Sequence, residues 1–311
     1  MQQLQLIIVL CLLTLGTWVW ILYRRFTGQR VLPLRPPSEP AAWGLAHVLL
    51  TLLSVLAFQL VAHAVMLHIW DMPAVDSPVT VEKAQLHMAL SSAGVLGAFF
   101  SLWLITRTSD TTARDLGIGF GPFLPGVTMG LLCFLSFATP SYVLNELLSL
   151  LDPRIHPVLD ELRHSKDMQF FSYSCITVVV LSPLYEEIIC RLILQGWLQS
   201  VFARQRPRSK ADLKSASPGG ELPSPEEFDG TATSPDRAPG RPTCWRSILL
   251  SSLFFAVLHF DAGLGSVGSL FLFAVGLGLI YQHSGRLLPC VVMHMALNAT
   301  TMLALYLEIR A

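Results

Sequence analysis

Long apolar runs, separated by short polar segments, dominate this chain. Eight runs can be read from the sequence: 4–23, 43–69, 85–106, 122–148, 169–200, 245–260, 266–282 and 287–308. A helix needs about 20 mostly apolar residues to cross the hydrocarbon core of a bilayer, and continuous apolar runs of this kind are typical of membrane spans. The pattern therefore predicts an all-α fold, a polytopic transmembrane helical bundle with about eight spans.

Composition agrees with lipid as the surrounding solvent. Charged residues make up 14% of the 311 residues and hydrophobic ones 52%, whereas about 25% of the residues in a soluble domain are charged. The formal net charge is zero and the chain has no glycine-rich phosphate loop, so we expect no nucleic-acid partner. The six cysteines have no C-x-x-C spacing, and no disulfide framework is expected.

Lysine and arginine are distributed unevenly between alternate loops. Loops 24–42, 107–121, 203–246 and 283–287 hold 15 of the 21 basic residues, and the opposite loops and the C-terminus hold 5. The positive-inside rule therefore places these four loops in the cytoplasm. The first run is preceded by MQQLQ, without a positive charge, and is expected to be a retained span rather than a signal peptide.

One run contains charges where a span should have none. The sequence SPLYEEIICR (182–191) carries Glu186, Glu187 and Arg191, and a charge at the bilayer centre costs at least about 2.5–3.5 kcal/mol on insertion scales. Glu187 and Arg191 are four residues apart with the acid first, the favourable order for an ion pair on a helix. Glu186 points about 100° away from Glu187 on a helix and is left without a partner, which favours a functional role for it. Pro183 leaves a backbone carbonyl without its helical donor.

Two later runs supply groups that suit Glu186. His259 ends one run, and His294 and Asn298 share a face of the last run because they are four residues apart. A carboxylate, two imidazoles and an amide provide a general base, proton carriers and donors for an oxyanion. This set favours hydrolysis of an acyl bond by water. The single histidines His47, His63, His68 and His87 are expected to be packing residues.

Three motifs in order complete the pattern: E-E-x-x-x-R at 186–191, F-x-x-x-H at 255–259 and H-x-x-x-N at 294–298. In this order and within late apolar runs, they resemble the type II CAAX prenyl endopeptidases and the related CAAX protease and bacteriocin-processing family of intramembrane proteases. The resemblance covers about 170–308. It departs from the family pattern at Leu192, where members often have glycine, and this puts close helix packing at that point in question.

The resemblance implies a division of the chain and a set of roles. Residues 1–168 would form N-terminal membrane spans and loops, and 169–308 a protease-like catalytic membrane region, interrupted by the Pro-, Gly- and Ser-rich cytoplasmic loop 203–244, which its composition predicts to be disordered. It also implies a cavity open to the cytoplasm. The implied roles are a water-activating base assisted by a histidine (Glu186 and His259), an oxyanion hole (His294 and Asn298) and a supporting pair (Glu187 and Arg191).

Alternatives stay open at this point. Glu186, His259 and His294 could hold zinc in a metalloprotease, although our expectation is no cofactor. A cysteine, Cys190 or Cys290, could be a nucleophile. A non-catalytic membrane binding or immunity protein could use the same polar groups for docking.

The expected partners are the lipid bilayer and a membrane-associated peptide or protein, prenylated or carrying a leader. The expected location is multi-pass, in a bacterial inner membrane.

Overall fold

The computed structural model describes residues 2–31, 41–69, 81–113, 115–118, 121–154, 156–165, 167–204 and 243–310. Every regular element in these ranges is a helix, which confirms the all-α prediction. The α-helices are α1 (Gln2–Phe26), α2 (Leu45–Ile69), α3 (Val81–Thr108), α4 (Phe123–Ser149), α5 (Pro157–Ser165), α6 (Met168–Cys175), α7 (Ser182–Glu187), α8 (Gly196–Arg204), α10 (Trp245–Val257), α11 (Gly263–Ser284) and α12 (Leu287–Arg310).

Each predicted apolar run corresponds to helix. Among the described residues, six helices (α1, α2, α3, α4, α11 and α12) are long and apolar enough to cross a membrane. The fifth run is a chain of shorter helical segments from α6 to α8, and the sixth is the shorter apolar helix α10. The fold is therefore that of a multi-pass integral membrane protein, in agreement with the prediction of about eight spans.

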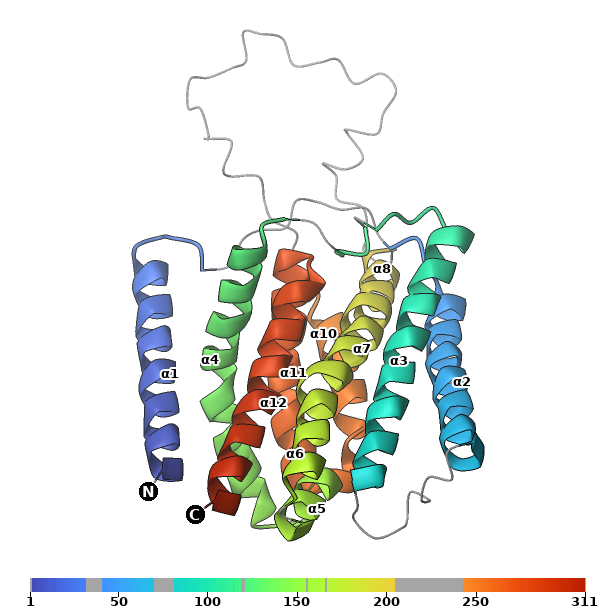
Figure 1. The fold of residues 1–311 in the computed structure, drawn as a ribbon. Helices are drawn as coiled ribbons and strands as arrows, with labels where there is room; N and C mark the ends of the chain where they lie inside the picture. The colour runs from blue at the N-terminus through green and yellow to red at the C-terminus, as the bar shows by residue number, and fades with distance from the viewer. Residues whose placement is uncertain are drawn as a thin grey trace, which may run out of the picture.

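The helices lie side by side along one common direction (Figure 1). The chain ends, at the start of α1 and the end of α12, lie on one face, and α8 ends on the opposite face. Peripheral helix α1 packs on α4, and α2 packs on α3. The outer surface is apolar, as in the exposed residues Leu4, Leu12 and Leu60, because in lipid the outside of a bundle needs no polar side chains.

Residues 168–204 are helical throughout, but two π-helical segments interrupt the α-helix. The π-helical segments η1 (Ile176–Leu181) and η2 (Ile188–Gln195) precede and follow α7, which carries both glutamates. The Ser182 amide donates to the carbonyl of Thr177, five residues back, which is the π pattern. Leu192 lies fully buried in η2, and the close approach in this region occurs at Gly196, where a Cβ would lie 2.7 Å from Cζ2 of Trp43.

A sharp turn joins α10 to α11. His259 and the short 3₁₀ segment η5 (Phe260–Ala262) form this turn, which ends at Gly263 with φ of 86°, a value that favours glycine. Asp152, in the loop between α4 and α5, accepts a hydrogen bond of 2.9 Å from the Leu264 amide. The turn that carries His259 is therefore fixed to that loop.

The predicted disordered loop 203–244 lies outside the described residues, except for its two ends. Helices α8 and α10, which flank it, pack against each other.

Candidate active site

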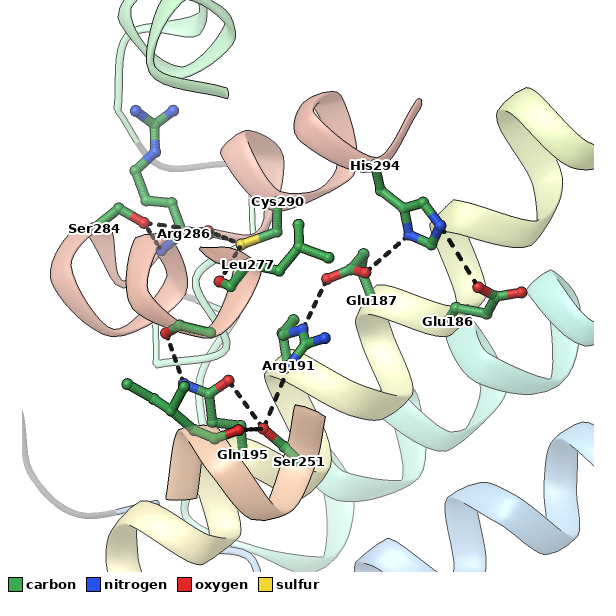
Figure 2. A network of polar contacts seen from close by, with 12 residues as sticks. Glu186, Glu187, Arg191, Gln195, Ser251, Leu277, Ser284, Arg286, Cys290 and His294 are labelled. Carbon is green, nitrogen blue, oxygen red and sulfur yellow. Dashed lines mark hydrogen bonds and ion pairs between the residues drawn. The ribbon is translucent and has the colours of Figure 1, made fainter. Parts of the chain in front are cut away.

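The predicted pair of Glu187 and Arg191 is present and fully buried (Figure 2). Arg191 Nε donates to Glu187 Oε2 at 3.2 Å, and Nη1 donates to Ser251 Oγ of α10 at 3.3 Å. The guanidinium also lies over the ring of Phe255, 5.6 Å from its centroid. Burial of both charges is tolerable because each is hydrogen-bonded to the other or to a neighbouring helix.

Gln195 extends this network to α11. Its amide nitrogen donates to the Gly278 carbonyl at 2.8 Å, and its amide oxygen accepts from Ser251 at 3.4 Å. The sequence analysis missed Gln195 and Ser251. The signal for Gln195 was its position four residues after Arg191 within an apolar run, because residues four apart share a helix face.

His294 lies between the two glutamates, as Figure 2 shows. Its Nδ1 is 2.9 Å from Glu187 Oε1, and its Nε2 is 3.8 Å from Glu186 Oε2. An ionised carboxylate only accepts hydrogen bonds, so Nδ1 carries the proton in the first contact. The second distance is too long for a direct hydrogen bond, and a separation above 3.5 Å is where a bridging water is expected.

Glu186 opens onto a cavity of about 730 Å³. The wall of this cavity also contains His259, His294 and Asn298, so the four residues predicted to be catalytic share one space. The Glu186 side chain is 17% exposed, whereas that of Glu187 is 0% exposed. The two adjacent carboxylates therefore have different environments, one facing the cavity and one sealed behind it.

His259 reaches the cavity from the turn between α10 and α11. Its Nδ1 donates to the Phe255 carbonyl at 3.0 Å, which leaves Nε2 as the acceptor of a neutral ring. Among the described residues, His294 is the histidine within ion-pair distance of Glu186, and His259 is not. The same residues contain no group of three His, Cys, Asp or Glu side chains close enough to hold a metal ion.

Asn298 is held by the backbone of the neighbouring span. Its Nδ2 donates to the Val178 carbonyl of η1 at 2.7 Å. One N–H group of the amide is thus engaged with η1, while the side chain still lines the cavity.

The positions of the cysteines argue against the cysteine alternative. Cys190 and Cys290 are buried, with exposed fractions of 1% and 0%, and neither is among the residues that line the cavity. The Cys290 thiol donates to the carbonyls of Leu277 and Arg286, away from Glu186 in Figure 2. Neither thiol therefore faces the space onto which Glu186 opens.

Sequence analysis missed a polar wall contributed by the first half of the chain. His87 of α3, expected to be a packing residue, lines the cavity, as do Tyr142 and Asn145 of α4. Tyr142 donates to the Leu297 carbonyl at 3.1 Å, which links α4 to α12. Polar residues within the apolar run 122–148 were the available signal. Helices from both predicted regions therefore build the cavity.

The cavity extends to the loop between α4 and α5, where Pro153, Arg154 and His156 contribute to its wall. Burial lowers the pKa of His156, and the nearby His259 lowers it further. By the count of basic residues this loop is on the external face. The external position of this loop and the opening to the cytoplasm that the family resemblance implies both stay predictions.

The fold and the cavity together define a class: a helical membrane protein with ionisable groups gathered between its spans, where such groups mark a functional site. Residues 231–300 match the model of the family described as Type II CAAX prenyl endopeptidase Rce1-like, which confirms the resemblance. In general terms, the match supports a CAAX-type intramembrane endopeptidase that acts on a membrane-associated substrate.

The matched stretch includes His259, His294 and Asn298, whereas Glu186 precedes it. No curated protein and no solved structure matches the chain.

Proposed function

We propose that this protein is an intramembrane endopeptidase in which Glu186 activates the water that hydrolyses a peptide bond of a membrane-associated substrate. The position of His294 carries the proposal, because this ring joins a sealed carboxylate to an open one at the wall of a cavity. The gap of 3.8 Å between His294 Nε2 and Glu186 Oε2 is where we place the water.

Only one of the two glutamates suits the role of base. The two oxygens of Glu187 accept hydrogen bonds from His294 and Arg191, and its side chain is fully buried. A carboxylate held in this way orients its neighbours and has no oxygen free for a water. Glu186 faces the cavity, so a substrate and a water can both reach it.

The reaction follows from these positions. Glu186 takes a proton from water as the water oxygen attacks the peptide carbonyl carbon, and the carbonyl oxygen becomes an oxyanion. Asn298 donates an N–H to the oxyanion, and His294 donates from Nε2 when that atom is protonated. Glu186 then passes the proton to the leaving amine as the C–N bond breaks. His259, with Nδ1 engaged by a backbone carbonyl, presents Nε2 to the same cavity and assists the proton transfer.

The test is cleavage by the purified protein, with a panel of a prenylated C-terminal peptide, a leader peptide and a membrane-spanning segment. Removing one oxyanion donor typically lowers turnover about 10²–10³-fold. We expect Glu186→Gln, which removes the base but keeps the shape, to lower turnover further than Asn298→Ala. Asp160→Asn, at an exposed contact with His164 outside the cavity wall, is the matched control and should cleave like the wild type. Equal cleavage by Glu186→Gln and the control would contradict the proposal.

Which of the three peptides is cleaved also identifies the class of substrate.

For the location of the protein, we propose a bacterial inner membrane.

A further inference from the structure

The carbonyl of Val178 lacks both of its possible helical donors. In an α-helix it would accept from the amide of Ser182, four residues on, but that amide donates to Thr177 in the π-helical segment η1. In a π-helix it would accept from residue 183, five residues on, and Pro183 has no N–H. A backbone carbonyl without a partner is unfavourable inside a membrane.

Asn298 of α12 supplies the missing donor. Its Nδ2 lies 2.7 Å from the Val178 oxygen, and an amide nitrogen is the end of that side chain that can donate. An amide nitrogen carries two N–H groups in one plane. A bond from one of them to a rigid backbone carbonyl therefore fixes the direction of the other.

We propose that Pro183 is a positioning residue that acts through the Val178 carbonyl. Pro183 keeps this carbonyl free of backbone donors, the carbonyl anchors Asn298, and the second N–H of Asn298 is thereby aimed into the cavity beside Glu186. This inference rests on the proposed function only where it assigns that second N–H to the oxyanion. The coupling between Pro183 and Asn298 is independent of any reaction.

The same arrangement of a proline and a side-chain donor occurs in α4, at residues that do not line the cavity. Pro140 lies inside α4 and cannot donate to the carbonyl of Ser136, four residues back. Trp18 of α1 donates its Nε1–H to that carbonyl at 3.1 Å. Pro140 and Trp18 are not among the residues that line the cavity, so this pair is a matched control for Pro183 and Asn298.

The first experiment is a double-mutant cycle on thermal stability in detergent, with Pro183→Ala, Asn298→Leu and both together. Asn298→Leu leaves the Val178 carbonyl without a donor, so we expect it to lower Tm when Pro183 is present. The Pro183→Ala variant regains a backbone N–H at this position, so Asn298→Leu should lower Tm far less in that background. Equal losses of Tm in the two backgrounds would overturn the proposal. Should Pro183→Ala fail to fold, Pro183→Ser, which also regains the backbone N–H, replaces it in the cycle, and equal losses of Tm in the two backgrounds would again overturn the proposal.

The second experiment measures kcat and KM on a cleaved peptide at a temperature where every variant is folded. A small misplacement of a catalytic group costs up to about 10²-fold in rate, so Pro183→Ala should lower kcat by about 10–10²-fold and leave KM nearly unchanged. Pro140→Ala, the control, should couple to Trp18 in stability but leave kcat unchanged. If Pro183→Ala keeps the wild-type kcat while the coupling in Tm is present, the anchoring of Asn298 stands, and only the role of its second N–H as an oxyanion donor is overturned. Absence of cleavage by the wild type would contradict the proposed function. The double-mutant cycle on Tm would still test whether Pro183 and Asn298 are coupled through the Val178 carbonyl.

Discussion

Replacement of Arg191 by alanine tests the support beneath the site. Arg191 and Glu187 are both 0% exposed, and Arg191 Nη1 also bonds Ser251 of α10. Removing one member of a buried ion pair typically costs about 3–5 kcal/mol, because the other charge stays buried without its partner. The scaling for chains of 150–250 residues would make this a fall in Tm of about 6–20 °C, and for this longer chain of 311 residues we expect the lower half of that range. Activity should fall too, because Glu187 holds His294.

Two control variants separate the loss of a buried ion pair from the loss of any arginine. Arg163→Ala removes an arginine from a half-exposed pair with Glu308, where about 0–1 kcal/mol is at stake, and should shift Tm by a few degrees at most. The double variant Arg191→Met with Glu187→Gln removes both buried charges and should recover most of the lost stability. The assay is thermal unfolding of the purified variants beside peptide cleavage. An Arg191→Ala protein with wild-type Tm and activity would refute the reasoning.

Three further outcomes are expected. Deleting residues 210–240, which are rich in Pro, Gly and Ser, should leave Tm and cleavage nearly unchanged, because α8 and α10 already pack together; loss of folded protein would show that the loop is structural. Exhaustive treatment with a zinc chelator should leave cleavage intact, and loss of activity that is restored by zinc would favour the metal alternative of Glu186, His259 and His294. Arg154 and the Leu264 amide hold the pKa of Asp152 well below its usual range, so its contribution to stability is present above the unfolded pKa of about 4 and is lost as pH falls below it. Asp152→Asn should flatten the dependence of Tm on pH between about 5 and 3, and an unchanged dependence would contradict this.

The sequence predicted the spans well and the site in part. Apolar runs predict membrane helices because lipid imposes one length and one polarity on every span, and the Glu187–Arg191 pair follows from helix periodicity alone. The position of His294 between two glutamates could not be predicted, because it depends on how α12 packs against α7.

The local sequence pattern also did not predict the π-helical hydrogen bonding in the fifth span. Pro183 predicted a free carbonyl, but the identity of that carbonyl, Val178, depends on the π-helical segment η1. Its partner, Asn298, lies on another helix and was assigned only to the oxyanion. The wall formed by Tyr142 and Asn145 was missed, because the sequence does not tell which helix the polar residues of a span face. That becomes known only when α4 is placed beside α12.

The most direct test of the central claim is single-turnover cleavage in ¹⁸O-labelled water by the wild type and by Glu186→Gln. The account predicts that the wild type places one labelled oxygen in the new carboxyl group, because water is the nucleophile. It predicts that Glu186→Gln keeps the wild-type Tm while its cleavage rate falls by more than about 10³-fold, since the base of the reaction is gone. Cleavage by Glu186→Gln within a few-fold of the wild-type rate would contradict the assignment of Glu186 as the base.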